Sequence, residues 1–181
     1  VPVFKSDLKT TVYPTSLING GSWTIPGDFS SAAFWIVAAA ITRESELQIK
    51  NVNVNPTRTG LLNVLKRMGL IYSIEDETLS GGEKTATIVV KSSSLEGTKV
   101  MPEEIPSLID ELPLLAVAAT QAEGITEVTG AEELRVKESD RIHAMAVGLK
   151  KLGAQIKETR TGGSSKARPP SQAAKQEAAE I

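Results

Sequence analysis

Two stretches of this sequence, Asn55-Pro-Thr-Arg-Thr-Gly60 and Lys137-Glu-Ser-Asp-Arg141, resemble each other and decide the fold. Each is a polar cluster with an arginine, and each is followed by an amphipathic stretch, basic residues and a glycine. Arg58 in the first stretch and Arg141 in the second are about eighty positions apart, an offset that indicates a structural repeat if other landmarks share it.

The same offset recurs upstream of each stretch. Asp28 opens the apolar run of residues 32–41, and Asp110 opens the uncharged run of residues 112–119. Four landmarks therefore agree, and we predict two copies of one unit of about eighty residues. Both runs are apolar on all sides, so each predicts a fully buried helix. Pro113 suits the first turn of the second one, where the missing N–H costs little.

A second, amphipathic helix is predicted after each polar stretch. Its apolar positions form one stripe per unit: Leu61, Leu62, Leu65 and Met68 in the first, and Ile142, Met145, Leu149 and Leu152 in the second. Asn55 and Pro56 are typical of a helix start, because asparagine caps helices and proline is preset for the first turn. Gly69 and Gly153 predict where the two helices end.

Strands are predicted in the gaps between these helices, at residues 22–25, 47–54, 70–75, 85–91, 98–102, 125–129 and 154–158. The fold class is therefore α/β, built of α+β repeats in the order β-α-β-α-β-β. We place the units at residues 1–92 and 93–159, which form one partial domain, residues 1–159. From Arg160 onward the sequence is polar without an apolar period, so we expect no strand and a flexible tail over residues 160–181.

Composition excludes several functional classes. The 181 residues include no cysteine and one histidine, with a formal net charge of −2. A disulfide scaffold and a cysteine nucleophile are excluded, and we expect no metal site. The longest apolar run is far shorter than the roughly 20 residues that span a bilayer. Without a signal peptide, a phosphate-binding glycine loop or a basic patch with aromatic residues, we expect a cytoplasmic protein that binds neither membrane nor nucleic acid.

Charged residues gather at the predicted helix starts. A helix N-terminus carries unpaired N–H groups and partial positive charge, which favour anions. Arg58, Lys137 and Arg141 would add formal charge there, and guanidinium binds carboxylate or phosphate through paired hydrogen bonds. Asp110 and Glu138 lie among these cations and could transfer protons. The plainer alternative is that these residues are caps and solvated ion pairs, and spacing alone favours that alternative.

Four segments resemble the 3-phosphoshikimate 1-carboxyvinyltransferase family, commonly named EPSP synthase: PGDFSSAAF (residues 26–34), NPTRTG (55–60), IDELP (109–113) and ELRVKESDR (133–141). The sequences of these four segments are most similar to those of the bacterial, glyphosate-tolerant type. The resemblance runs from about residue 22 to about residue 158. It implies an inside-out α/β barrel with buried helices and outward-facing sheets. Each domain of that family has three such units, and this chain would hold two from the C-terminal domain.

The resemblance also implies a reaction and its residues. The family transfers the enolpyruvyl group of phosphoenolpyruvate to shikimate 3-phosphate, in aromatic amino acid biosynthesis, without a cofactor. Asp110 matches the family's proton acceptor, which also contacts the shikimate hydroxyls. Glu138 matches the acid proposed to act on the phosphoenolpyruvate carbons. Lys137 matches a contact of shikimate 3-phosphate, and Arg141 matches a contact of phosphoenolpyruvate. We interpret the remaining motif residues as structural: Asp28, Ser30, Ser31 and Arg58.

Other parts of the family's site have no match in this sequence, namely the motifs of the second domain and the later arginine and lysine that hold phosphoenolpyruvate. We therefore expect a truncated member that is inactive alone, and either a homo-oligomer or a complementing chain as its partner. Three alternatives stay open. They are one half of a split transferase, a non-catalytic binding or assembly domain, and a UDP-N-acetylglucosamine enolpyruvyl transferase, whose usual cysteine this sequence lacks.

Overall fold

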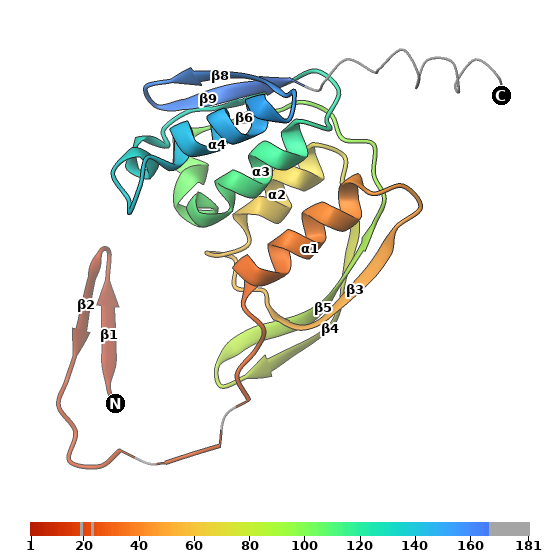
Figure 1. Ribbon diagram of the computed structural model, residues 1–181. Helices are drawn as coiled ribbons and strands as arrows, with labels where there is room; N and C mark the ends of the chain where they lie inside the picture. The colour runs from red at the N-terminus through yellow and green to blue at the C-terminus, as the bar shows by residue number, and fades with distance from the viewer. Residues whose placement is uncertain (19, 23, 167–181) are drawn as a thin grey trace.

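The computed structural model describes residues 1–18, 20–22 and 24–166. Within this part of the chain, four α-helices lie together and two sheets cover them from outside (Figure 1). The helices are α1 (Phe29–Ile41), α2 (Gly60–Arg67), α3 (Leu112–Ala119) and α4 (Arg141–Lys151). Three short 3-10 helices join them to the sheets: η1 (Pro102–Ser107), η2 (Ile109–Glu111) and η3 (Glu132–Arg135). The fold is thus mixed α/β with inner helices and outer sheets.

The two sheets share one topology. The first has the order β3-β5-β4, with β3 (Glu46–Asn53), β4 (Ile71–Ser80) and β5 (Glu83–Lys91). The second has the order β6-β7-β9-β8, with β6 (Lys99–Val100), β7 (Ile125–Val128), β8 (Gln155–Thr159) and β9 (Gly162–Lys166). In both, the strand between two helices pairs with the far strand of the following hairpin. The predicted repeat is therefore visible as α1-β3-α2-β4-β5 followed by α3-β7-α4-β8-β9.

Strand β9 corrects the expectation that no strand follows Arg160. Its residues Gly162–Lys166 pair antiparallel with β7 on one side and with β8 on the other. A side chain at Gly162 would collide with the backbone of Val128, so glycine is required where the strand enters the sheet. The rest of the expected tail, residues 167–181, lies outside the described residues.

One hydrophobic core joins the two units. It includes Phe29 and Ile36 of α1, Leu61 and Leu65 of α2, Ile88 of β5 and Leu115 of α3, all at most 1% exposed. The amphipathic stripe of α2 is fully buried, as predicted. Leu152 is wrong as the last residue of the α4 stripe, since it is 75% exposed beyond the end of the helix. The core therefore depends on α1, α2 and α3, with α4 packed at its edge.

Helix α1 is not buried on all sides. Phe34 and Trp35 are 62% and 64% exposed, and Ser31 and Ala38 on the same side are exposed too. These four positions follow the i, i+3, i+4, i+7 spacing of one helix face. We use "the α1 stripe" for Ser31, Phe34, Trp35 and Ala38. It is an apolar surface, where the sequence predicted full burial.

The predicted start of α2 at Asn55 and Pro56 is also wrong. The Asn55 side chain accepts hydrogen bonds from the backbone N–H and the hydroxyl of Thr57, at 3.0 and 2.9 Å. This closes a local turn, which is the other structure that asparagine favours. Helix α2 begins five residues later, at Gly60, where any side chain would collide with Ser107.

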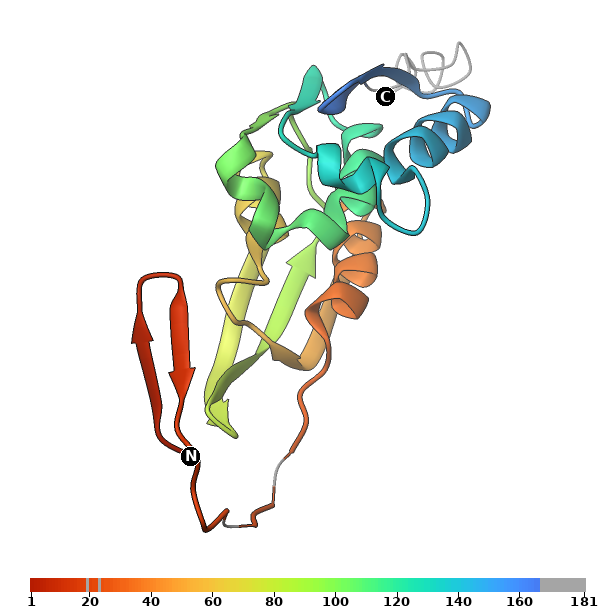
Figure 2. The same cartoon turned by 90° about the vertical axis from the view of Figure 1, so that its left-hand side faces the viewer.

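Two further features differ from the sequence analysis. The described residues 22, 24 and 25 of the first predicted strand form no strand, although Gly27 makes an isolated bridge to Val52. A hairpin of β1 (Val3–Ser6) and β2 (Lys9–Val12), which the sequence did not predict, stands apart from the body in both views (Figures 1 and 2). Gly69 and Gly153 do follow their helices, with φ of 101° and 91°. No helix in the described part of the chain is long and apolar enough to cross a membrane.

Candidate functional site

The N-terminal ends of the helices meet at one place. Ser30 lies in the first turn of α1, Arg58 precedes α2, Asp110 precedes α3, and Arg141 is the first residue of α4. Side-chain contacts connect all four, as described below. In Figure 1 the N-terminal ends of the four helices all lie on the left of the helix layer. The fold thereby gathers residues from both units.

Asp110 lies between two arginines. Its carboxylate oxygens are 3.5 Å from Nη1 of Arg58 and 3.7 Å from Nη1 of Arg141. The three side chains are partly open to solvent, with exposed fractions of 43%, 47% and 30% respectively. Both distances are longer than direct hydrogen bonds, so the guanidinium groups keep donors for another anion. The arrangement suits a ligand with phosphate or carboxylate groups.

A chain of hydrogen bonds connects Arg58 through Ser30 to Glu111. Nη2 of Arg58 donates to the hydroxyl of Ser30 at 2.9 Å, and that hydroxyl donates to Glu111 at 2.5 Å. Glu111 is only 2% exposed, so its carboxylate depends on this partner. The chain Arg58–Ser30–Glu111 joins the first unit to the residue next to Asp110. We call it the Ser30 link.

Lys137 and Glu138 occupy the turn before α4. Nζ of Lys137 is 2.7 Å from Glu133, and this hydrogen bond, with the charge of Glu133, raises the pKa of Lys137. Glu138 is 2.6 Å from Nη2 of Arg141. The pKa of Glu138 is lowered, first by its own backbone N–H and then by Arg141. Both groups are therefore charged at neutral pH, with Glu138 able to accept a proton.

The cap of α4 fixes Arg141. Asp140 accepts a hydrogen bond from the backbone N–H of His143 at 2.9 Å, and Arg135 donates to its other oxygen at 2.7 Å. Arg135 also donates to the carbonyls of Thr159, the last residue of β8, and Arg160, which follows it. The cap is thus tied to the second sheet, and the first residue of α4 is held in place.

The structure pairs Arg141 with both Asp110 and Glu138 and places Lys137 in the adjoining turn. Arg58, which we interpreted as structural, contacts Asp110 itself. Glu111 has no role in the expectations from the sequence, because its pairing with Ser30 depends on how α1 packs in the fold. In the described residues no group of three or more metal-ligating side chains gathers.

The family model for EPSP synthase (3-phosphoshikimate 1-carboxyvinyltransferase) matches residues 1–179 of this chain. The chain belongs to this family. The match extends through most of the segment that we expected to lie outside the resemblance. It also includes the turn with Asp110 and the start of α4, so the site just described lies within the family's own sequence.

Relatives agree with the family model. The 3-phosphoshikimate 1-carboxyvinyltransferase of Thermosynechococcus vestitus is 52% identical over 147 residues, which is 81% of this chain and 33% of that protein. That of Streptococcus uberis is 49% identical over 160 residues, covering 88% and 37%. An EPSP synthase structure from Acinetobacter baumannii superposes with a TM-score of 0.89 at 41% identity, over 94% of this chain and 39% of that one. This chain thus spans little more than a third of the length of these relatives.

Proposed function

We propose that this chain supplies the Asp110 side of an enolpyruvyl-transfer site. The reaction would move the enolpyruvyl group of phosphoenolpyruvate to the 5-hydroxyl of shikimate 3-phosphate. The observation that carries the proposal is Asp110 between Arg58 and Arg141 in a chain of this family. Both substrates carry phosphate, and both carry carboxylate, which are the groups that paired guanidinium donors bind.

The chemistry needs two protons given and two taken. The methylene carbon of phosphoenolpyruvate gains a proton, and the 5-hydroxyl adds to the neighbouring carbon and loses its proton. The adduct then loses a methyl proton and phosphate, which leaves with one proton as hydrogen phosphate. Carboxylates beside the reacting atoms suit these transfers. We assign the hydroxyl proton to Asp110 and the carbon protons to Glu138. Lys137 would contact shikimate 3-phosphate, and Arg141 would bind phosphoenolpyruvate.

Arg141 connects the binding and the proton transfer. In the free chain its Nη2 holds Glu138 at 2.6 Å and helps to lower the pKa of that carboxyl. An anion that takes over the donors of Arg141 would remove part of this stabilisation. The pKa of Glu138 would then rise toward its ordinary range, so that Glu138 could donate a proton as well as accept one.

A non-catalytic binding domain is the second candidate, and the exposure of the site favours it for the chain alone. Asp110 and Arg58 are 43% and 47% exposed, so water reaches the groups that would react. Positioning can supply about 7–11 kcal/mol of a barrier, and a half-open site loses much of it. We therefore expect the isolated chain to bind the anions without turning them over. A second polypeptide that closes the site would make a split enzyme.

Calorimetric titration with phosphoenolpyruvate tests the proposal. The wild-type chain should bind it, and Arg141→Ala should bind at least about tenfold more weakly, since one paired anion contact exceeds 1.4 kcal/mol. Arg43→Ala removes an exposed arginine after α1 and should leave the affinity unchanged. Absence of binding, or equal loss in both variants, would refute the proposed site. Phosphate release by the pure chain, abolished by Asp110→Asn, would refute the expected inactivity.

We further propose that the chain is of the bacterial, glyphosate-tolerant type, works in the cytoplasm and represents part of the C-terminal domain. The wording of residues 55–60 and 133–141 supports the type. Adding a polypeptide with the remaining segments of a relative should restore phosphate release. The glyphosate concentration that halves this rate then measures tolerance, and inhibition as strong as in a sensitive enzyme would contradict it.

We also propose that the chain associates with itself through the α1 stripe. Two large side chains on it, Phe34 and Trp35, are more than half exposed. Exposed apolar surface of this kind marks interfaces, and two-fold dimers are the commonest closed assembly.

A further inference from the structure

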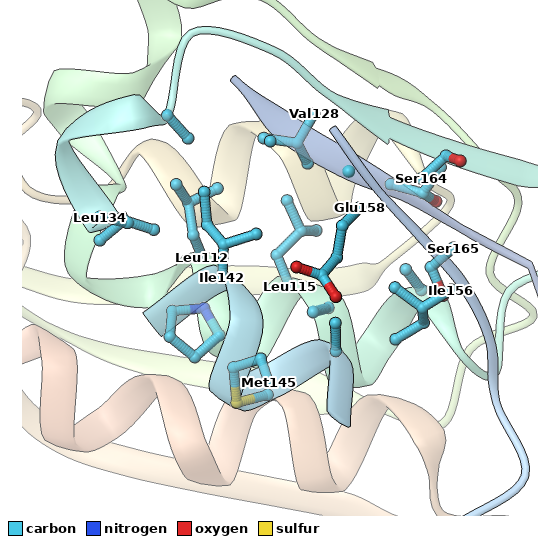
Figure 3. A pocket seen from close by; sticks show the side chains of 18 of the residues that line it. Leu112, Leu115, Val128, Leu134, Ile142, Met145, Ile156, Glu158, Ser164 and Ser165 are labelled. Carbon is cyan, nitrogen blue, oxygen red and sulfur yellow. The ribbon is translucent and has the colours of Figure 1, made fainter. Parts of the chain in front are cut away.

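A cavity of about 90 Å³ lies between α3 and α4 on one side and the second sheet on the other. Leu112, Leu115, Ile142 and Met145 line it from the helices, and Val128, Ile156 and Ser165 line it from the strands (Figure 3). The walls are therefore mostly hydrocarbon. The cavity is separate from the Asp110 site, although Arg141 contributes to both.

The residues of β9 explain why this space is empty. Gly163 and Ser165 alternate onto the face of β9 that lies over the helices, between Val128 and Thr126 of β7 on one side and Glu158 and Ile156 of β8 on the other. Central strands of a covered sheet usually carry large apolar side chains there. A glycine and a serine at these two positions leave the volume of their missing side chains unfilled.

Two residues in the cavity wall carry buried hydroxyl groups without partners. Thr126 and Ser165 are 2% and 7% exposed, and neither side-chain oxygen has a hydrogen-bond partner among the residues that the structure describes. The two residues are direct cross-strand partners, so their side chains lie on the same face of the sheet. Buried hydroxyls without partners are rare, and each costs free energy until a ligand satisfies it.

We propose that this cavity is a binding site for a small neutral alcohol. The hydrocarbon chain of such a ligand would lie against Leu115, Ile142 and Ile156, and its hydroxyl would bond to Thr126 and Ser165. The volume sets the size, because an apolar cavity of roughly 150 Å³ takes benzene and this one is smaller. An anionic ligand is excluded, because the carboxylate of Glu158 also lines the cavity (Figure 3) and most of the remaining wall is hydrocarbon.

Titration of the full chain with 1-butanol tests the proposal by methyl NMR. The signals of Leu115, Ile142 and Ile156 should shift saturably, while Ile88, buried in the first sheet, should not move. A millimolar affinity is expected of a ligand with so few atoms. A linear, unsaturated shift in the wild-type chain would overturn the proposal without any variant.

Variants distinguish binding that needs the hydroxyl groups from binding that needs only the cavity volume. Thr126→Val keeps the volume and removes the hydroxyl, so 1-butanol should bind about tenfold more weakly while xenon binds unchanged. Ser165→Val fills the cavity and should abolish binding of both probes. Thr10→Val, on exposed β2, is the matched surface control. Equal 1-butanol affinity in Thr126→Val and Thr10→Val, or binding of xenon alone, would show an empty or hydrated void and overturn the proposal.

Discussion

The Ser30 link shows how one hydroxyl joins the two units at the level of a single residue. Ser30 accepts from Arg58 and donates to Glu111, 81 positions further along the chain. Ser30→Ala would leave a buried carboxylate without its partner and Arg58 with one contact fewer. A lost hydrogen bond of this kind costs about 1–3 kcal/mol. We expect a loss of that size in the free energy of unfolding, measured with urea.

Ser31→Ala is the matched control for that loss. The hydroxyl of Ser31 donates to Asp28, but Ser31 is exposed and its backbone N–H keeps the same acceptor at 2.8 Å. Its removal should cost clearly less than removal of the Ser30 hydroxyl. Equal losses in the two variants would mean that the Ser30 link does not stabilise the junction.

Asp140 gives a pH-dependent prediction at the same scale. The pKa of Asp140 lies below the ordinary 3.8. The hydrogen bond from the backbone N–H of His143 lowers it most, and Arg135 lowers it further, while desolvation acts in the opposite direction. Its stabilising contribution is therefore present above the unfolded pKa and is lost as the pH falls through the lower folded pKa. Asp140→Asn keeps a good cap but does not titrate. The stability difference between wild type and variant should therefore be constant above about pH 5 and shrink below about pH 4.

Urea unfolding at several pH values from neutral to acid measures this difference for the two proteins. Lys137 and Glu138 are unchanged in both, so their titration cancels to first order. A difference that stays the same throughout the acid range would show that the cap carries no pH-dependent stability.

At the scale of elements, β9 holds the second sheet together. It lies between β7 and β8, so removing residues 162–181 would leave two strands without their common partner. We expect the amide protons of β9 that bond to β7 and β8 to be protected in hydrogen exchange. A chain that ends at Thr161 should lose α4 together with the sheet. If the amide protons of residues 162–166 exchange as fast as those of an unfolded peptide, β9 is not formed and the flexible tail predicted from the sequence is correct.

The same strand shows what sequence patterns can and cannot predict. Apolar periodicity reports what a segment buries, and it located α1, α2, α3 and most of α4. The strand Gly-Gly-Ser-Ser-Lys has no such signal, because backbone pairing with two neighbours determines its place. Asparagine is common both as a helix cap and in turns, so Asn55 alone did not show which of the two it forms. Composition of α1 likewise could not tell that Phe34 and Trp35 lie outside the core.

The candidate site, too, could be predicted only in part from the sequence. The sequence predicted charged residues at each helix start, and Arg58 of the first unit does meet Asp110 of the second. The contact between Ser30 and Glu111 was not predictable, because it depends on how α1 packs against the turn before α3. Local spacing gives the charges at each helix end, and tertiary packing decides which of them touch.

On the scale of the whole molecule, the α1 stripe predicts association. Phe34 and Trp35 expose more than half of their area beside Ser31 and Ala38 on one helix face. Burying two aromatic side chains stabilises a complex by several kcal/mol, before the cost of association is subtracted. A stable dimer buries about 1,200–2,000 Å² in total, so the contact must extend beyond these two residues. We expect a dimer at micromolar concentration.

Light scattering on three proteins tests whether the chain associates through the α1 stripe. Wild type should have the mass of a dimer, and Trp35→Ser should shift the population to monomer, because a polar side chain at the centre of the contact removes its largest apolar area. Leu79→Ser is the matched control, since Leu79 is 74% exposed on β4, away from α1. It should remain dimeric, because its loss does not touch the α1 stripe. If wild type and both variants are monomers, the exposed aromatic residues of α1 do not drive self-association. Equal dissociation by Trp35→Ser and Leu79→Ser would place the interface elsewhere on the molecule.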